Sequence, residues 1–334
     1  MKKRIAVLLG DGAGVGPELV AMSAASGSLA GQCDPIILGD ERVFRRALKF
    51  IGKEDFSYQL IDGFDHLNFD GRPCFYDMRN LDPADYTMGE TSAVTGKASI
   101  EQLDLGLKLW KDGIVGALLF GPLNKVSLKA YKGEKYASEM TYIREVLQYN
   151  GPSCEVNHMK NVFTTRVTSH VPLADVCRYI NKEAIMDAAR LLWKTMKEAG
   201  YEAPRIAVAA LNPHGGENGT CGREEIDIIA PAIEALHAEG IPCEGPIAAD
   251  SLFFRAFHGD EFDGVVTMYH DQGQIPLKLL GFVEGIVAIQ GGIPCPILTP
   301  SHGTAFEIAG TGTASVVSFE KALKDAVAMA QSTE

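Results

Sequence analysis

Three strand-like runs of this chain each end at a histidine, and this repetition constrains the fold more than any other feature. The runs cover residues 162–170, 205–214 and 264–270 and end at His170, His214 and His270. In an open α/β sheet, ligands bind beyond the carboxyl ends of the strands. Three imidazoles at such an edge can bind one divalent cation and leave a position open for a substrate. A single histidine is more often structural, so the repetition carries the argument for a metal site.

Apolar strand segments alternate with segments of helical periodicity along most of the chain. Strands are expected at residues 5–9, 35–38 and 115–120, and helices from residue 17 and at 40–50, 92–110, 182–199, 224–238 and 319–330. This alternation predicts an α/β protein with mainly parallel sheets and helices on both faces. The 334 residues exceed what one core usually serves, which predicts two domains. Residues 52–90 hold many turn formers, and a hairpin or arm is expected there.

Composition excludes several classes of function. The net charge of −12 and the lack of a basic run exclude nucleic-acid binding, which needs a basic face. The longest apolar stretches, such as 114–120, are far shorter than the roughly 20 residues that span a bilayer. The first residues do not resemble a signal peptide. The seven scattered cysteines form no C-x-x-C and suit buried thiols in a reducing compartment, and none stands where a nucleophile would be recognised. The sequence therefore predicts a soluble, cytoplasmic protein.

A glycine-rich loop at residues 10–16 links the first strand to the first helix. Its glycines alternate and Pro17 follows directly, so it does not match the G-x-G-x-x-G fingerprint of a dinucleotide-binding domain. Two interpretations remain open: a tight strand-to-helix turn, or a loop that lines a cleft.

Several longer segments together carry a specific resemblance. They read YHDQGQIPLK (269–278), LNPHGGE (211–217), TSHVPL (168–173), GPLNK (121–125) and GDGAGVGPE (10–18). In this order they closely resemble the 4-hydroxythreonine-4-phosphate dehydrogenase family, from about residue 4 to residue 330. Residues 302–310, HGTAFEIAG, resemble the adenosine-binding loop that this family shares with isocitrate and isopropylmalate dehydrogenases.

The resemblance implies a homodimer of two-domain α/β/α subunits with the active site in the cleft between the domains. Residues 1–128 plus 280–334 would form the cofactor-side domain, and residues 129–279 the domain for metal binding and dimerisation. NAD or NADP would bind at a loop that includes His302, Gly303, Thr304 and Ala305.

The resemblance also implies a divalent metal held by three histidines, one of them from the partner subunit. They correspond to His170, His214 and His270, the residues that the strand ends select. Zinc is the expected metal, with cobalt, manganese or magnesium as alternatives. The expected site residues further include Asp250, Asp271, Lys278 and Ser138. Lys278 has a solvated surface lysine as its alternative interpretation, and Asp250 has a helix N-cap.

Members of this family oxidise a secondary alcohol β to a carboxylate and pass hydride to NAD or NADP, after which the β-keto acid can lose carbon dioxide. The metal would lower the pKa of the alcohol and polarise the new carbonyl. A general base is needed for the hydroxyl proton, and Lys125 and Asp271 are the candidates.

The chain departs from the family where the substrate phosphate binds. The family's phosphate-binding histidine falls on Ala137 or Ser138, its arginine on Ile297 and its asparagine on Ala288. Losing an arginine removes a bidentate phosphate donor. We therefore expect an unphosphorylated hydroxy acid or dihydrodiol carboxylate as substrate, as for a relative that acts on the cis-dihydrodiol of terephthalate.

Three alternatives stay open at this point. The chain could be a 4-hydroxythreonine-4-phosphate dehydrogenase itself, a metal-dependent lyase or hydrolase that no longer uses nicotinamide, or a non-catalytic binding protein. The 302–310 loop argues against the second alternative. The retained histidines together with Asp250, Asp271 and Lys278 argue against the third.

Overall fold

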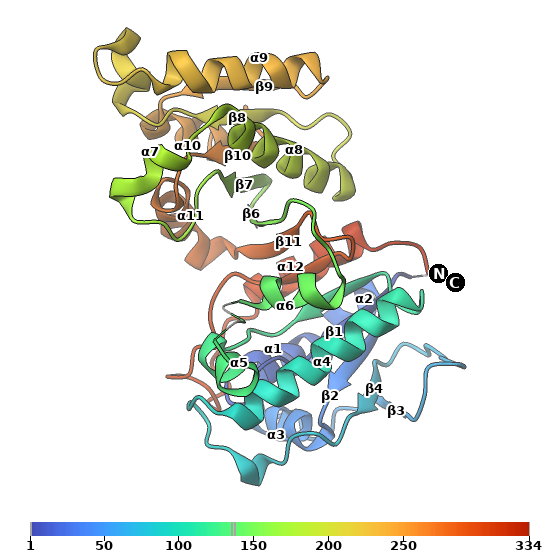
Figure 1. Cartoon of the computed structure of the whole chain (residues 1–334). Helices are drawn as coiled ribbons and strands as arrows, with labels where there is room; N and C mark the ends of the chain where they lie inside the picture. The colour runs from blue at the N-terminus through green and yellow to red at the C-terminus, as the bar shows by residue number, and fades with distance from the viewer. Residues whose placement is uncertain (1, 135, 137, 334) are drawn as a thin grey trace. The chain divides into compact units, whose positions relative to one another are not determined.

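The computed structural model describes residues 2–134, 136 and 138–333, which divide into two compact units (Figure 1). The first unit comprises Met1–Asn150 and Ile293–Glu334, and the second comprises Gly151–Gly292. The sequence placed the divisions earlier, at 128 and 279. The helices α5 (Lys125–Lys132) and α6 (Glu139–Val146) thus belong to the first unit, and the strand β11 (Val287–Gly291) belongs to the second. The functional role of each unit stays a prediction.

The sheet of the first unit is parallel in all its described pairings. Its strands follow the order β3 (Gln59–Ile61), β4 (Cys74–Asp77), β2 (Asp34–Gly39), β1 (Arg4–Leu8), β5 (Ala117–Phe120) and β12 (Ile297–Pro300). The hairpin expected within residues 52–90 is wrong, because β3 and β4 run parallel and extend the sheet beyond β2. Hairpin strands would be antiparallel.

The described helices of the first unit are α1 (Gly16–Ala25), α2 (Ser28–Gln32), α3 (Glu41–Phe50), α4 (Ala93–Lys111), α5, α6 and α12 (Val317–Met329), with a short 3₁₀ turn η1 (Pro83–Asp85). Four of them, α1, α3, α4 and α12, lie where the sequence predicted helices, whereas α2, α5 and α6 were not predicted. The Asp40 carboxylate caps α3 by accepting from the Arg42 N–H, and the Ser92 hydroxyl caps α4 by accepting from the Thr95 N–H. Leu103 and Leu107 of α4 pack on Leu8 of β1, which fixes this helix on the sheet.

The sheet of the second unit places the three histidine-bearing runs side by side. Its strands follow the order β11, β6 (Cys154–Met159), β7 (Val162–Arg166), β10 (Gly264–Thr267), β8 (Ile206–Ala209) and β9 (Cys243–Ile247). From β7 to β9 the pairings are parallel, whereas β6 is antiparallel to both of its neighbours. The predicted α/β class with mainly parallel sheets is confirmed.

Helices cover both faces of this second sheet. They are α7 (Val176–Tyr179), α8 (Lys182–Glu198), α9 (Ala230–Ala238), α10 (Ala249–Phe257) and α11 (His270–Glu284), with 3₁₀ turns η2 (Leu173–Asp175) and η3 (Pro213–Gly219) and a π-helical turn η4 (Glu225–Ile229). Val265 packs in a cluster with Leu252 of α10, whereas the next-door Gly264 faces Leu192 and Met196 of α8. Because neighbouring strand residues point to opposite faces, α8 and α10 lie on opposite sides of the sheet.

No helix in the described part of the chain is long and apolar enough to cross a membrane. All seven cysteines are free thiols. Burial raises the pKa of Cys33 and of Cys243 to about 12 each, so these thiols are poor nucleophiles at neutral pH.

A bidentate ion pair joins the starts of β8 and β10 in the second unit. The Arg205 guanidinium donates to the two Asp263 carboxylate oxygens at 3.0 and 2.8 Å, and the Arg205 backbone N–H donates to the same carboxylate at 2.9 Å. Burial alone would raise the pKa of Asp263, but these hydrogen bonds outweigh it and lower the pKa below its usual value.

A lowered carboxyl pKa stabilises the fold above the unfolded-state value of about 3.9, and this contribution is lost as pH falls through the folded-state pKa. We therefore expect Asp263→Asn to be less stable than the unaltered protein at pH 7 and to lose less stability between about pH 5 and pH 2. Urea unfolding across this range measures the difference. Asp260→Asn, at an exposed neighbouring aspartate, is the control. Parallel loss of stability in all three proteins would contradict this role of Asp263.

Candidate functional site

The carboxyl ends of β7, β10 and β8 meet at one edge of the second unit's sheet. Thr267 of β10 pairs with Arg166 of β7, and Val266 of β10 pairs with Val208 of β8, all in parallel register. Beyond these ends the chain reaches His170, His270 and His214. All three histidines therefore follow strand ends at one edge of the sheet, as the sequence predicted, and their role as metal ligands stays a prediction.

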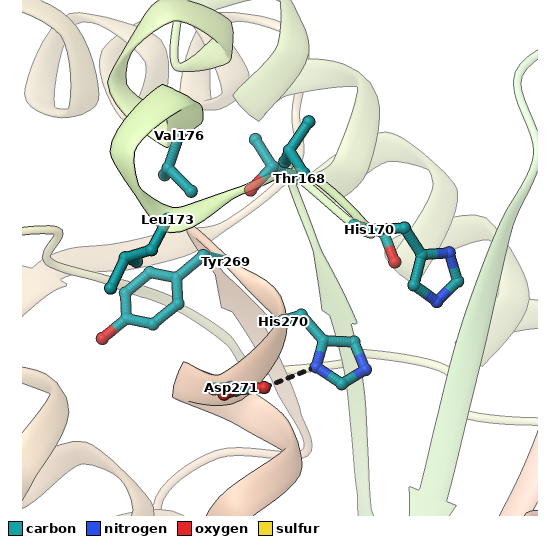
Figure 2. A pocket seen from close by; sticks show the side chains of 9 residues that line it. Thr168, His170, Leu173, Val176, Tyr269, His270 and Asp271 are labelled. Atoms are coloured by element: carbon teal, nitrogen blue, oxygen red, sulfur yellow. Dashed lines mark hydrogen bonds and ion pairs between the residues drawn. The ribbon is translucent and has the colours of Figure 1, made fainter.

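Two of these histidines face each other in one cavity. The ring centres of His170 and His270 lie 5.8 Å apart. Two imidazoles on one tetrahedral zinc, with Zn–N bonds of about 2.0–2.1 Å, have ring centres roughly 5 Å apart, so this spacing fits a metal. The cavity measures about 240 Å³ and is lined on its other side by apolar and aromatic side chains, among them Leu173, Val176 and Tyr269 (Figure 2).

Asp271 sets the orientation of the His270 ring. Its Oδ1 lies 2.7 Å from His270 Nδ1, as the dashed line in Figure 2 shows. An ionised carboxylate only accepts hydrogen bonds, so Nδ1 carries the proton and donates it. The second ring nitrogen, Nε2, is then left with its lone pair for a metal, an arrangement common among metal-binding histidines.

His214 lies on the same sheet edge but outside this cavity. Its side chain is 70% exposed, and its Nδ1 is 3.7 Å from Glu217 Oε1. In residues 2–134, 136 and 138–333, no three His, Cys, Asp or Glu side chains of one chain are grouped closely enough to hold a metal ion. The chain thus brings two of the three predicted ligands together, and a site shared between subunits stays a prediction.

Both His170 and His214 adopt a left-handed backbone conformation, with φ of 54° and 53°. Non-glycine residues rarely adopt positive φ, and those that do cluster at functional sites. No local pattern in the sequence indicated this strain.

Asp250 and Lys278 are exposed residues of helices in the second unit, and neither lines the cavity. Asp250 lies in the first turn of α10, whose N-cap position is occupied by Ala248. The interpretation of Asp250 as an N-cap is therefore wrong. Lys278 lies on α11, two turns after His270.

Two predicted residues of the first unit, Lys125 and Ser138, lie at helix starts. Lys125 is the exposed first residue of α5, and the preceding Asn124 caps this helix by accepting from the Val126 and Ser127 N–H groups. Asn124 Nδ2 also donates to Thr304 Oγ1 at 3.4 Å, so the start of α5 adjoins the predicted cofactor loop. Ser138 caps α6 by accepting from the Thr141 N–H at 3.3 Å. The alternative position, Ala137, lies outside the described residues.

The glycine loop supports the predicted cofactor loop. The Val15 N–H donates to the Thr304 carbonyl at 3.0 Å, and a Cβ on Gly14 would lie 2.8 Å from Thr304 Cβ. Only glycine allows this approach. Within the cofactor loop, His302 Nδ1 lies 2.9 Å from the Gly303 carbonyl oxygen, and Ala305 has a φ of 45°. The loop at residues 10–16 is thus a tight turn that also carries residues 302–305.

Sequence reasoning missed the partner of Glu18. This side chain is 1% exposed, and its two oxygens accept the backbone N–H groups of Gly310 and Gly312 at 2.6 and 2.7 Å. The sequence identified Glu18 only as an acid in the first turn of a helix. Its partners lie almost the whole chain away, beyond the reach of a local pattern.

The expectation that Ile297 and Ala288 line the substrate site is wrong. Ile297 is fully buried in β12, where it pairs with Leu118 in the core of the first unit. Ala288 is buried in β11 of the second unit and pairs with Asn157. Neither side chain can contact a substrate, so the main argument for an unphosphorylated substrate is lost.

We expect Glu18→Ala to lower the free energy of unfolding by about 1–3 kcal/mol, because it leaves buried N–H groups at Gly310 and Gly312 without an acceptor. Glu18→Gln keeps one acceptor oxygen and should lose less. Urea denaturation measures both variants. A Glu18→Ala protein as stable as the unaltered chain would show that these two hydrogen bonds contribute nothing.

Comparison with known proteins gives a consistent picture. Residues 31–326 match the model of a family described as pyridoxal phosphate biosynthetic protein PdxA. A Pseudomonas aeruginosa protein, provisionally named 4-hydroxythreonine-4-phosphate dehydrogenase 2, is 44% identical over 98% of this chain and 96% of its own. The D-threonate 4-phosphate dehydrogenase of Cupriavidus necator is 37% identical over 98% of this chain and 97% of its own.

Two solved structures resemble this chain to different degrees. The 4-hydroxythreonine-4-phosphate dehydrogenase of Klebsiella pneumoniae superposes with a TM-score of 0.84 at 33% identity, covering 98% of this chain and 99% of that one. A terephthalate 1,2-cis-dihydrodiol dehydrogenase of Burkholderia xenovorans LB400 gives a TM-score of 0.65 at 25% identity, covering 95% of both chains. The chain is thus more similar to the first structure than to the second.

Proposed function

Because the chain belongs to the PdxA family of NAD(P)-dependent, metal-requiring dehydrogenases, we propose that it oxidises a phosphorylated β-hydroxy acid. The observation that carries this proposal is the pair of histidines, 5.8 Å apart, at the carboxyl edge of a parallel sheet. Such a pair suits a cation that acts on a substrate hydroxyl group. We also propose a cytoplasmic location, since the seven free thiols suit a reducing compartment.

The metal ligands in this proposal are His170, His214 and His270, contributed by two copies of the chain. Asp271 holds the His270 ring so that Nε2 faces the metal. Zinc suits neutral imidazole ligands at a site with an open position, and when bound it supplies a Lewis acid that lowers the pKa of the substrate hydroxyl.

The substrate class follows from the relatives. 4-Hydroxythreonine 4-phosphate and D-threonate 4-phosphate share a four-carbon chain with a carboxylate at C1, a hydroxyl group at C3 and a phosphate at C4. Enzymes named for these substrates are 44% and 37% identical to this chain, whereas the dihydrodiol dehydrogenase is 25% identical. We therefore propose a substrate with the same carboxylate, hydroxyl and phosphate.

One observation favours a second candidate, the unphosphorylated substrate. The family's phosphate-binding histidine has no counterpart at residues 137–138, and Ser138 uses its hydroxyl group to cap α6. A hydroxy acid or dihydrodiol carboxylate without phosphate would not need that histidine.

The remaining residues take the following proposed roles. Asp271 already accepts a hydrogen bond from His270, so we assign the role of general base to the other candidate, Lys125. Lys278 contacts the substrate, and Asp250 lies near it. Residues 302–305 bind NAD or NADP. A lyase that has lost nicotinamide chemistry would not bind NADH, which fluorescence titration detects.

We expect the metal-loaded enzyme to reduce NAD or NADP with a 4-phosphorylated β-hydroxy acid and to lose activity with a chelator. His270→Ala should lower kcat/KM about 100-fold or more, because the Lewis acid contributes several kcal/mol to catalysis. His66→Ala, at an exposed histidine of the first unit, should leave kcat/KM unchanged. Paired assays with threonate and threonate 4-phosphate test the substrate class. Activity of His270→Ala equal to that of the unaltered enzyme would refute the metal site, and a preference for threonate would favour the second candidate.

An apolar stripe on α11 supports the proposed homodimer. Ile275, Leu279 and Val283 are spaced four residues apart and are 66%, 79% and 80% exposed. Residues at this spacing lie on one face of a helix. A row of large apolar side chains in water marks an interaction surface. The stripe lies on the helix that starts with His270, and the described residues of one chain do not group three metal ligands there. We therefore propose that a second copy of the chain covers it.

Leu279→Glu should convert a dimer into a monomer, because it places a charge in the proposed apolar contact. Leu60→Glu, at an exposed leucine of β3 in the first unit, is the matched control and should stay dimeric. Sedimentation velocity measures both proteins. If Leu279→Glu stays dimeric, this face of α11 is not the dimer contact.

A further inference from the structure

We propose that Glu225 is a positioning residue that fixes the turn carrying His214 and thereby sets the affinity of the metal site. The inference rests on the proposed role of His214 as a metal ligand. It concerns a residue that lies eleven positions further along the chain, on a different turn, η4.

The turn that carries His214 has an unusual backbone. Residues 214–219 all have positive φ, between 46° and 94°, so the chain makes a left-handed turn over six consecutive residues. Three of them, His214, Glu217 and Asn218, are not glycine and are strained in this region. A turn of this kind persists only where surrounding groups hold it.

Glu225 stabilises the chain at the start of this turn. Its side chain is buried, and its Oε1 accepts the backbone N–H groups of Leu211 and Asn212 at 2.9 and 2.7 Å. Its Oε2 accepts Asn212 Nδ2 at 2.9 Å. These bonds fix the backbone immediately before Pro213 and His214.

The same carboxylate also packs on the turn itself. A Cβ on Gly216 would lie 2.7 Å from Glu225 Oε2. In the described part of the chain, no basic side chain forms an ion pair with Glu225, so three N–H donors satisfy its buried charge. Moving a buried carboxylate away from its N–H donors costs free energy, because its oxygens would lose their hydrogen bonds. These hydrogen bonds therefore hold the carboxylate and its donors in one arrangement.

The local helix geometry suits this role. Glu225 is the first residue of the π-helical turn η4, which precedes α9. Single π-helical turns are rare in proteins overall, but those that occur are often found at functional sites. They shift side chains relative to their positions in a regular helix.

The position of the His214 ring depends on this backbone. The ring is largely exposed, and Glu217 Oε1, on the same turn, is 3.7 Å from its Nδ1. Loosening the turn would therefore displace the ring and weaken a metal bound by it. Residues that orient metal ligands typically change metal affinity about 10–100-fold when they are replaced.

We would measure Co²⁺ binding to the metal-stripped, full-length dimer, using the visible absorption of the bound ion. Glu225→Gln keeps the size of the side chain but turns an amide N–H₂ group toward a donor, either Asn212 Nδ2 or the two backbone N–H groups. The variant should bind Co²⁺ about 10–100-fold more weakly, with an altered absorption spectrum. Glu224→Gln is the matched control, because Glu224 accepts from the Asn212 side chain and from Arg223 but not from the backbone of Leu211 or Asn212.

Gly216→Ala is a second variant with the same expected loss, since its methyl group would push on the Glu225 carboxylate and would strain a backbone whose φ is 78°. Thermal unfolding and NADH titration show that each variant is folded. His214→Ala separates the two hypotheses. If His214→Ala binds Co²⁺ normally, the proposed metal site is wrong. If His214→Ala loses Co²⁺ while folded Glu225→Gln and Gly216→Ala both bind it as tightly as Glu224→Gln does, the positioning role of Glu225 is overturned.

Discussion

The parallel pairing of β7, β10 and β8 is the constraint on which the candidate site depends. Parallel strands present their carboxyl ends at one edge, so His170 and His270, 100 positions apart in sequence, reach a common surface there. His170 and His270 follow two of these strands and meet at 5.8 Å. A strand order in which β7 and β10 are not neighbours would separate them.

In both units, a buried carboxylate without a basic partner among the described residues binds backbone N–H groups of a separate loop. Glu18 holds Gly310 and Gly312 in the first unit, and Glu225 holds Leu211 and Asn212 in the second. Each carboxylate is buried and binds N–H donors only, within the described residues. In each case the held segment adjoins residues proposed to bind a cofactor or a metal. A loop that must hold a fixed shape without regular hydrogen bonding needs acceptors of this kind.

Local signals predicted about half of the described helices and strands, because caps and apolar periodicity act over a few residues, as at Asp40 and Ser92. They failed for β3 and β4, since the direction of a strand depends on its partner and not on its own residues. They also failed for Ile297, where counting from a motif ignored that the residue begins a buried strand. The three histidines could be selected from the sequence because each ends its own strand-like run. Glu18 and Glu225 were missed because their partners are defined only by the fold.

The backbone strain at His170 and at His214, taken together, says more about the candidate site than the strain at either residue alone. A left-handed conformation costs an L-residue roughly 1–2 kcal/mol, so two such histidines at one sheet edge are unexpected unless their direction matters. The positive φ turns each ring away from the path that an extended strand would give it. His270 reaches the same edge without strain, because it begins α11 and takes its orientation from Asp271. The fold thus directs the three rings by two different means: backbone strain in the segments that follow the flanking strands β7 and β8, and the carboxylate of Asp271 on α11, which follows the central strand β10.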